Sequence, residues 1–332
     1  MIITKSPVRI SYCGGGSDFP EFFNFQKQIG CVVSSTIAKY VYVFTNPQSA
    51  DAIDKFKFTY RITESVIDYK KIKHPVVNRV LSNMDWDYPL NLATIADVPG
   101  QSGLGSSSAF TAALIQNLHL RRNISLDKSK LAKEAIRVER KQLNEAGGWQ
   151  DQFATVYGDF RSYKFSKNGV KISRPLIDQT TKMFLQARQI LVSSRVLKTN
   201  LNASTSLKNK LEQKSLEDMC TNAQVAANLT EKLKDSYGQP GKCYSHLLEA
   251  VNSNWSIKQK LIMNSDFKVK LNKLTKKLSE YNIDAIKLLG SGDGGYLLIM
   301  ASPSTIRKMT LDDNIFTLKF EFDHKGTKAI CF

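Results

Sequence analysis

Histidine, paired cysteine and long apolar runs are scarce or missing in this sequence, and each absence argues against a class of protein. Only four histidines occur and no two have metal-ligand spacing, which argues against a zinc site. The five cysteines are scattered without a CxxC pair, a pattern typical of reduced thiols in a cytoplasmic protein. No apolar run approaches the roughly 18 residues of a membrane span, and the first residues lack a signal-peptide pattern, so we expect no membrane partner.

Acidic residues are also few relative to basic ones. The 332 residues include 47 Lys+Arg against 30 Asp+Glu, which gives a formal net charge of +17. Such an excess is found in nucleic-acid-binding proteins, and also in proteins with a lysine-rich surface and a site for anionic ligands. The lysines are spread along the chain, and no compact basic block with interleaved aromatic residues occurs. We therefore expect a small anionic ligand and no nucleic-acid partner.

The order of strand-like and helix-like segments predicts an α+β protein. The apolar fraction of 42% and the charged fraction of 23% are those of a globular chain. Helical patterns cover 106–120 and 127–144 and most of 204–281, with a break at 238–241. A loosely placed boundary near 170–185 divides the chain into predicted domains 1–178 and 179–332. Strands are predicted at 8–12, 40–44, 56–60, 90–95, 161–165, 189–193, 285–289, 296–300 and 316–322.

A small-residue loop before an alanine-rich helix is the most informative segment. Its glycines allow close approach of a ligand to the backbone, and its serines fall where a helix leaves amide groups unpaired. A helix N-terminus attracts phosphate, which favours phosphate binding over a plain serine cap. The GxxxxGK[ST] pattern of a Walker loop is absent. The predicted ATP and phosphate-binding residues are Pro99, Gly100, Gln101, Ser102, Gly103, Leu104, Gly105, Ser106, Ser107 and Ser108.

A second glycine cluster, at 290–295, contains a GxGxxG pattern. A dinucleotide-binding loop requires a helix after the glycines, whereas a strand-like run follows here, so we reject that interpretation. A hairpin alone needs fewer than four glycines in six residues. Close packing against a ligand or another backbone explains the cluster better.

Two carboxylates near a helix end are candidates for chemistry. Helical spacing places Glu139 on the apolar face of 130–143, where a charge needs an ionic partner or a bound cation. A core salt bridge and a metal site explain it equally well, and the neighbouring Arg140 and Lys141 are expected to point elsewhere. Asp151 follows two glycines and is either a helix cap or a catalytic carboxylate.

Three motifs in this order resemble the superfamily of galactokinase, homoserine kinase, mevalonate kinase and phosphomevalonate kinase, abbreviated GHMP. They are the N-terminal motif of residues 6–9 and 14–18, the phosphate loop at 103–108 and the glycine motif at 290–295. The segment Gly147–Gln152 and the Gly-Gly-Gly-Ser-Asp start resemble most the D-glycero-D-manno-heptose 7-phosphate kinase branch. The resemblance implies a domain like ribosomal protein S5 domain 2 followed by a ferredoxin-like domain.

The resemblance also implies roles for individual residues. Asp151 matches the catalytic aspartate, and Arg9 lies where a basic residue meets the transferred phosphoryl group. Ser107 and Glu139 match ligands of Mg²⁺. Substrate contacts are implied for Gly15, Gly16, Ser17, Asp18, Gly292 and Gly294. Asp293 departs from the family pattern, because it replaces a glycine and brings a carboxylate toward phosphates.

The implied activity is transfer of a phosphoryl group from ATP, with Mg²⁺, to the anomeric O1 of D-glycero-D-manno-heptose 7-phosphate. The product would be the 1,7-bisphosphate, a precursor of GDP-heptose in lipopolysaccharide biosynthesis, made by a cytoplasmic monomer or homodimer. Two alternatives stay open. One is another GHMP kinase, acting on galactose, fucose, mevalonate or homoserine, and the other is a nucleic-acid-binding protein with an S5-like fold.

Overall fold

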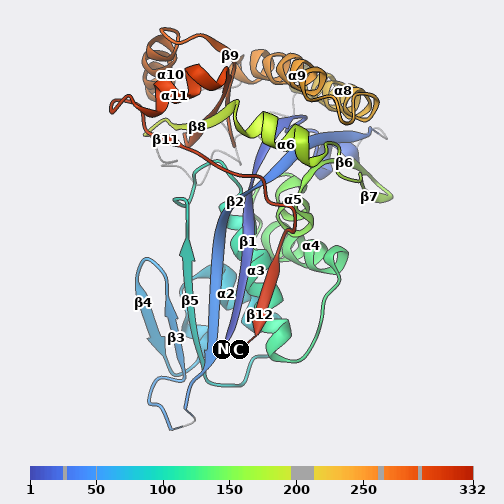
Figure 1. The fold of residues 1–332 in the computed structure, drawn as a ribbon. Helices are drawn as coiled ribbons and strands as arrows, with labels where there is room; N and C mark the ends of the chain where they lie inside the picture. Colours follow the sequence, from blue (N-terminus) through green and yellow to red (C-terminus); the bar gives the residue numbers. More distant parts are fainter. Residues whose placement is uncertain (25–27, 50, 196–212, 261–264, 291–293, 332) are drawn as a thin grey trace.

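Runs of strands and runs of helices are interspersed along the chain in the computed structural model, which describes residues 1–24, 28–49, 51–195, 213–260, 265–290 and 294–331 (Figure 1). The first part contains β1 (Ile2–Cys13), α1 (Pro20–Phe23), β2 (Gly30–Pro47), β3 (Phe56–Thr59), β4 (Thr63–Val66), the 3₁₀ turn η1 (Tyr69–Lys71), α2 (Pro75–Asn83), β5 (Leu90–Ala96), α3 (Ser106–Arg121), α4 (Lys128–Ile136), the π-helical turn η2 (Arg137–Gln142), α5 (Gln150–Tyr157), β6 (Phe160–Ser166) and β7 (Gly169–Ile172). The second part contains α6 (Gln179–Gln186), β8 (Gln189–Ser193), α8 (Gln213–Asp235), α9 (Pro240–Lys260), α10 (Ser265–Leu278), β9 (Ile283–Leu288), β10 (Tyr296–Ala301), α11 (Pro303–Thr310), β11 (Thr317–Leu318) and β12 (Lys328–Cys331).

The larger sheet has eight strands, in the order β12–β1–β2–β5–β3–β4, with β6 attached to β2 and β7 to β6. All of its pairs are antiparallel except β3 with β5. The long strand β2 pairs with β6 through its first residues and with β5 through its last. The pairing of β1 with β2 shifts register between Pro7 and Val8, directly before Arg9. Such irregularities re-aim side chains, and this one precedes a predicted site residue.

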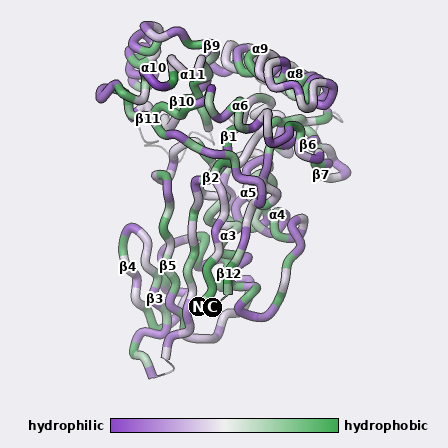
Figure 2. Tube along the Cα trace, in the orientation of Figure 1, coloured by the Kyte–Doolittle hydropathy of each residue, from purple (hydrophilic) through white to green (hydrophobic). Residues whose placement is uncertain are grey.

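Helices α3 and α5 pack on β1 and β2 of the larger sheet, and α2 and α4 pack against these helices, α2 on α3 and α4 on both (Figure 1). Figure 2 shows that α3 and the strands beside it are rich in hydrophobic residues. Because its buried face carries small side chains, α3 can approach the strands closely. Its fully buried apolar residues are Ala109, Ala112, Ala113, Leu114, Ile115 and Leu118. The loop before α3 is therefore held on a rigid, buried element.

The smaller sheet has the strand order β11–β8–β10–β9 and its own apolar core. Helix α9 packs against β9, and α8 packs against both α9 and β2, so the second half rests on the end of the larger sheet (Figure 1). Among the described helices, none has the length and apolar character needed to cross a membrane.

The predicted α+β class is confirmed, and the predicted strands within β1, β2, β3, β5, β6, β8, β9 and β10 are present. The short strands β4, β7 and β12 were not predicted, because four residues carry too little periodicity. The predicted helix 127–144 ends as a π-helical turn at 137–142. The predicted boundary at 178/179 lies between β7 and α6 and stays a prediction. The chain end nevertheless returns to the larger sheet, since β12 pairs with β1.

Candidate active site

The loop between β5 and α3 is the first component of the site. Gly103 and Gly105 have φ values of 78° and 75°, a left-handed conformation that favours glycine. Gly105 is the N-cap residue of α3, and it supplies no side-chain hydrogen bond to the first turn. The first amide groups of α3 therefore remain available to an anion at the positive end of the helix. This geometry suits the predicted binding of phosphate.

The ten predicted phosphate-binding residues differ in how far they are buried. Pro99, Gly100, Gln101 and Ser107 are exposed, and Gly105 and Ser106 are half-buried. Ser102, Gly103, Leu104 and Ser108 are buried. The carbonyl of Leu104 accepts a hydrogen bond from the Arg9 amide at 2.8 Å, so this residue fastens the loop to β1. The loop thus has an outer part open to a ligand and an inner part bonded to the sheet.

The glycine cluster between β9 and β10 packs behind the loop that joins β5 to α3, and we call this side the back of that loop. A β-carbon on Gly290 would lie 2.5 Å from the α-carbon of Gly103, and one on Gly295 would overlap the carbonyl of Ser102. The Tyr296 amide donates to the Ser102 carbonyl at 3.1 Å. The expectation of close packing is confirmed here, and the neighbour is another backbone. Gly294 is buried, while Gly292 and Asp293 lie outside the described residues.

Arg9 and Asp151 form a two-bond ion pair at the front of the loop. Arg9 Nε donates to Asp151 Oδ1 and Arg9 Nη2 donates to Asp151 Oδ2, each at 2.7 Å. Arg9 Nη1 donates to the Gly103 carbonyl at 2.6 Å. The side chains are 6% and 19% exposed, so the carboxylate keeps some access from outside. A β-carbon on Gly105 would lie 3.2 Å from Asp151 Oδ2, which places the carboxylate directly beside the start of α3.

Glu139 is fully buried, as its helical spacing predicts. Its Oε1 accepts from the Thr111 hydroxyl at 2.7 Å, and its Oε2 accepts from the Ser108 hydroxyl at 2.9 Å and from the Gln152 side-chain amide. Arg140 Nη2 lies 3.9 Å from Glu139 Oε2. The expectation that Arg140 points elsewhere is therefore wrong, because the π-helical turn rotates the side chains after 137 relative to an α-helix.

The oxygen atoms around Glu139 are of the kinds that Mg²⁺ prefers, namely a carboxylate, hydroxyls and a side-chain amide. The buried Oε1 atom of Gln152 has no hydrogen-bond partner among the described residues, so one hard ligand atom is uncommitted. Within the described ranges no group of three acidic, histidine or cysteine residues could hold a metal by itself. A Mg²⁺ ion held here would accordingly share its coordination with phosphate oxygens and water, as is usual for this ion.

The predicted metal ligand Ser107 is exposed, whereas its neighbour Ser108 points to Glu139. Sequence reasoning missed Ser108, Thr111 and Gln152 as partners of the carboxylate. A usable signal was present, because Ser108 and Thr111 are three residues apart and share one face of α3. The signal for Gln152 is only its place directly after Asp151.

Ser17 and Asp18 are buried, and their polar atoms are bonded within the protein. The Ser17 hydroxyl donates to the carbonyls of Gly14 and Cys31 and accepts from the Cys31 amide. Asp18 Oδ1 accepts from the Gly16 amide at 3.0 Å and Asp18 Oδ2 from the Gln150 amide at 3.1 Å. The side chains of both residues hold the loop 14–18 against the start of α5. Their expected substrate contacts stay predictions.

The pKa of Asp18 is raised above its usual value, chiefly because the carboxyl group is buried. The nearby Asp151 carboxylate adds to this rise. A β-carbon on Gly148 would overlap the Asp18 carboxylate, so glycine is required at the contact. Because Gln150 begins α5 and Asp151 follows it, the Asp18 carboxylate orients the helix that carries Asp151.

Gly15 and Gly16 are half-buried between α5 and α8. A β-carbon on Gly15 would lie 3.8 Å from Gln150 Nε2, and one on Gly16 would lie 3.6 Å from Met219 Cγ. The buried Oε1 atom of Gln150 has no hydrogen-bond partner among the described residues. Gln150 is thus a substrate-binding candidate that sequence reasoning missed, one residue from Asp151.

Comparison with known proteins agrees with this architecture. Residues 70–159 match the family model described as GHMP kinases N terminal domain. A D-glycero-alpha-D-manno-heptose 7-phosphate kinase from Campylobacter jejuni is 26% identical over 347 aligned positions, which cover 99% of this chain and 98% of that protein.

Two solved structures illustrate the likeness in fold. A D-glycero-D-manno-heptose 1-phosphate kinase from Bacteroides thetaiotaomicron has a TM-score of 0.78 and 19% identity, covering 100% of this chain and 99% of that one. The Streptococcus pneumoniae phosphomevalonate kinase, in complex with phosphomevalonate and AMPPNP, has a TM-score of 0.72 and 16% identity, covering 97% and 100%. At these identities the structures establish the fold, which is the GHMP kinase fold.

Proposed function

We propose that this chain, which belongs to the GHMP kinases, transfers the terminal phosphoryl group of ATP to a hydroxyl of a D-glycero-D-manno-heptose phosphate. The acceptor would be the anomeric O1 of the 7-phosphate, and the product the 1,7-bisphosphate. A full-length relative named as a heptose 7-phosphate kinase supports the substrate class. Heptose phosphate also occurs in the name of a structural neighbour.

One observation carries the proposed chemistry, and it is the position of Asp151. The carboxylate lies beside the first turn of α3, where nucleotide phosphates would bind, and Arg9 fixes both of its oxygens. Phosphoryl transfer requires mainly alignment of the attacking hydroxyl and neutralisation of charge on the phosphates. A rigid carboxylate next to an anion-binding helix end supplies the first requirement, and the helix end supplies part of the second.

In the reaction the acceptor oxygen bonds to the γ-phosphorus while the bond from that phosphorus to the bridging oxygen breaks, releasing ADP. Asp151 accepts a hydrogen bond from the acceptor hydroxyl, orients it, and takes its proton as the new bond forms. Because Arg9 donates one bond to each oxygen of Asp151, the carboxylate is held in a fixed position from which it can accept this proton. Arg9 also bonds the Gly103 carbonyl, so one guanidinium aligns both the loop and the base.

Glu139 is the residue proposed to hold Mg²⁺, with a serine hydroxyl from the start of α3. Ser107 remains the proposed serine, although the described geometry makes Ser108 a second candidate. When bound, the ion would neutralise charge on the ATP phosphates. The hydroxyls of Ser108 and Thr111 hold the Glu139 carboxylate in a fixed orientation.

The proposed substrate side of the site is the space next to Gly15, Gly16 and Gln150. The glycines present backbone to a ligand at close range, and the uncommitted amide oxygen of Gln150 can accept a hydrogen bond from a sugar hydroxyl. Gly292 and Gly294 stay proposed substrate contacts. Ser17 and Asp18 also stay proposed substrate contacts, and their bonds within the protein hold the loop 14–18 in place.

A substrate panel tests the function. ATP consumption would be measured with D-glycero-D-manno-heptose 7-phosphate, the corresponding 1-phosphate, galactose, fucose, mevalonate and homoserine. We expect kcat/KM for the 7-phosphate to exceed that for each other acceptor by at least about tenfold, because the polar groups that bind the heptose stay unpaired with the other acceptors. Phosphorus NMR of the product would identify the phosphorylated oxygen. Higher kcat/KM with mevalonate, homoserine or a free sugar would contradict the proposed substrate and favour another GHMP kinase.

A further inference from the structure

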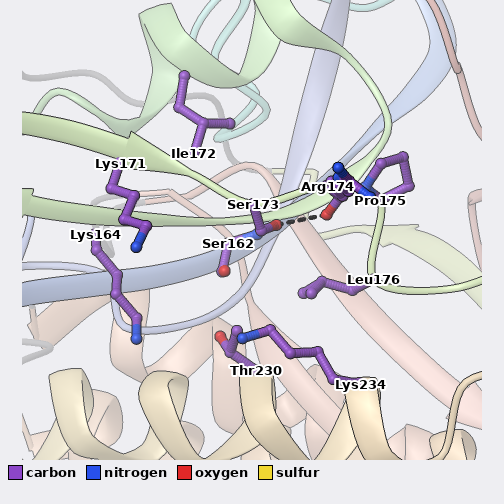
Figure 3. Close-up of a pocket in the computed structure, with 10 residues that line it drawn as sticks. All are labelled: Ser162, Lys164, Lys171, Ile172, Ser173, Arg174, Pro175, Leu176, Thr230 and Lys234. Atoms are coloured by element: carbon purple, nitrogen blue, oxygen red, sulfur yellow. Dashed lines mark hydrogen bonds between the residues drawn. The ribbon is translucent and has the colours of Figure 1, made fainter.

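A cavity of about 380 Å³ lies between the β6–β7 hairpin and α8 (Figure 3). Four of the side chains that line it are cationic: Lys164 on β6, Lys171 on β7, Arg174 just after β7 and Lys234 on α8. Its volume falls within the range of small-molecule sites in proteins, which is roughly 300–1,000 Å³. None of its lining residues belongs to the loop, the carboxylates or the glycines of the active site.

Two of these cations stand directly opposite each other in the sheet. Lys164 and Lys171 are cross-strand partners in the antiparallel pair β6–β7. Like charges in this relation destabilise a hairpin, so the pair is unfavourable unless a negative group lies close by. The protein supplies one such group, Glu231, whose carboxylate lies 3.7 Å from Lys164 Nζ and 2.9 Å from Lys234 Nζ.

Glu231 cannot balance the whole cluster, because it already pairs with two of the four cations. Within the described ranges, Lys171 and Arg174 have no carboxylate within 4.0 Å. The hydroxyl of Ser162, which none of the described residues bonds, adds a hydrogen-bond donor on the floor of the cavity. Figure 3 shows its oxygen pointing toward Thr230 and Lys234 of α8.

We propose that this cavity binds a small phosphorylated molecule at a site separate from the active site. A phosphate group would place its negative oxygens between Lys164, Lys171 and Lys234, remove the repulsion across the hairpin and engage Arg174. The apolar residues Ile172, Pro175 and Leu176 line the rest of the cavity and suit the carbon skeleton of such a ligand. A small ligand fits better than a nucleic acid, because the four cations line one cavity rather than a long surface track.

Calorimetric titration of the full-length protein with pyrophosphate tests this site. Saturating AMPPNP would be present throughout, to occupy the phosphate loop. We expect one saturable event in the wild type and a Kd raised at least about tenfold in the double variant Lys171→Gln/Arg174→Gln, which loses two charge-assisted contacts. The matched control Lys70→Gln/Lys71→Gln removes two exposed charges from η1 and should bind like the wild type.

Three results would overturn the proposal. Pyrophosphate binding that AMPPNP abolishes would belong to the active site. Equal loss of binding in both double variants would mean general attraction to a basic surface. A single-stranded oligonucleotide that binds more tightly than pyrophosphate, and that the Lys171→Gln/Arg174→Gln change releases, would make the cavity part of a nucleic-acid surface. Kinase turnover of the same variants shows that the proteins are folded, so a negative titration stays interpretable.

Discussion

Gly105 and Gly290 have nearly the same backbone conformation but opposite surroundings. Their φ values are 75° and 76°, so a side chain would strain either position about equally. A β-carbon on Gly105 would meet side-chain atoms of Asp151 and Arg9 at 3.2 and 3.3 Å. A β-carbon on Gly290 would meet the backbone of Gly103 at 2.5 Å. The front of the loop thus lies beside the side chains proposed for catalysis, whereas the back packs against another stretch of backbone.

This difference shows that a glycine-rich sequence does not by itself reveal whether its glycines make room at a site or allow backbone packing. At the front, glycine leaves room beside a charged pair that must stay in place for catalysis. At the back, glycine lets two backbones touch, which fixes the loop from behind. Substitutions at the front should therefore reduce turnover more than stability, and substitutions at the back should do the reverse.

The largest effect at the front is expected for Asp151→Asn. Turnover should fall by about 10²–10⁴-fold, because the amide cannot take the proton of the acceptor hydroxyl. ATP affinity should change little, since the loop and α3 are intact. Stability should fall by about 1–3 kcal/mol, because the buried Arg9 loses one charged partner. Steady-state kinetics, nucleotide titration and thermal melting measure the three quantities.

The matched control is Asp178→Asn, which removes a carboxylate that caps α6 away from the site. This variant should lose stability slightly and keep its turnover. If Asp151→Asn retains more than about a tenth of wild-type turnover, well short of the loss expected for a general base, the base is another group.

The second prediction concerns Glu139→Gln, which removes a charge deep behind the loop. If Glu139 holds Mg²⁺, turnover should fall about 10-fold or more and the Mg²⁺ concentration for half-maximal activity should rise. Thermal melting should change little, because Ser108, Thr111 and Gln152 can reorient toward the amide. A lowered melting temperature with unchanged Mg²⁺ dependence would instead make Glu139 the partner of Arg140 in a core ion pair.

The third prediction compares Gly105→Ala with Gly290→Ala. Because alanine is strained in the left-handed backbone conformation, each variant should lose about 1–2 kcal/mol of unfolding free energy. Gly290→Ala should lose a further 1–3 kcal/mol or so, because two backbones must separate. Gly105→Ala should show the greater loss of kcat per unit of lost stability, since its methyl group presses on Asp151 and Arg9. Urea unfolding and kinetics on both proteins decide this, and the reverse order would refute the division into front and back.

The smallest effect concerns Lys287, which is buried and donates to the carbonyls of Ser11 and Tyr12 at 2.7 Å, joining β9 to β1. Burial lowers the pKa of Lys287 to about 7. Above pH 7 the folded protein loses this proton while the unfolded chain keeps it. The unfolding free energy should therefore rise with pH, by up to about 1.4 kcal/mol per pH unit.

Urea unfolding at pH 7 and pH 8 measures this dependence. Lys287→Met should flatten the rise, although it also lowers stability at both values by removing two hydrogen bonds. Lys70→Met, at an exposed position, should keep the wild-type slope. An unchanged slope in Lys287→Met would mean that Lys287 keeps its charge throughout this range.

Local patterns in the sequence predict much of the fold. The β-branched and aromatic runs at 40–44 and 296–300 lie in strands, and the alanine-rich run after 106 is a buried helix. Helical spacing also places Glu139 on a buried face. These features depend on residues within one or two turns, so their periodicity is visible in the chain itself. Short elements such as β12 escape prediction because their pairing partner is distant in sequence.

The sequence by itself determined that a glycine and serine loop precedes a buried helix, that a carboxylate lies on an apolar helix face, and that a second glycine cluster stands between two strands. Only the tertiary structure decided that Arg9 bonds Asp151, which is 142 positions away in the chain. It also decided that the second glycine cluster packs behind the first loop, and that Ser108 rather than Ser107 donates to Glu139. Adjacent residues of a helix point about 100° apart, so the packing of α3 on the sheet selects which serine faces inward. Contacts between distant segments follow from topology, which local spacing does not encode.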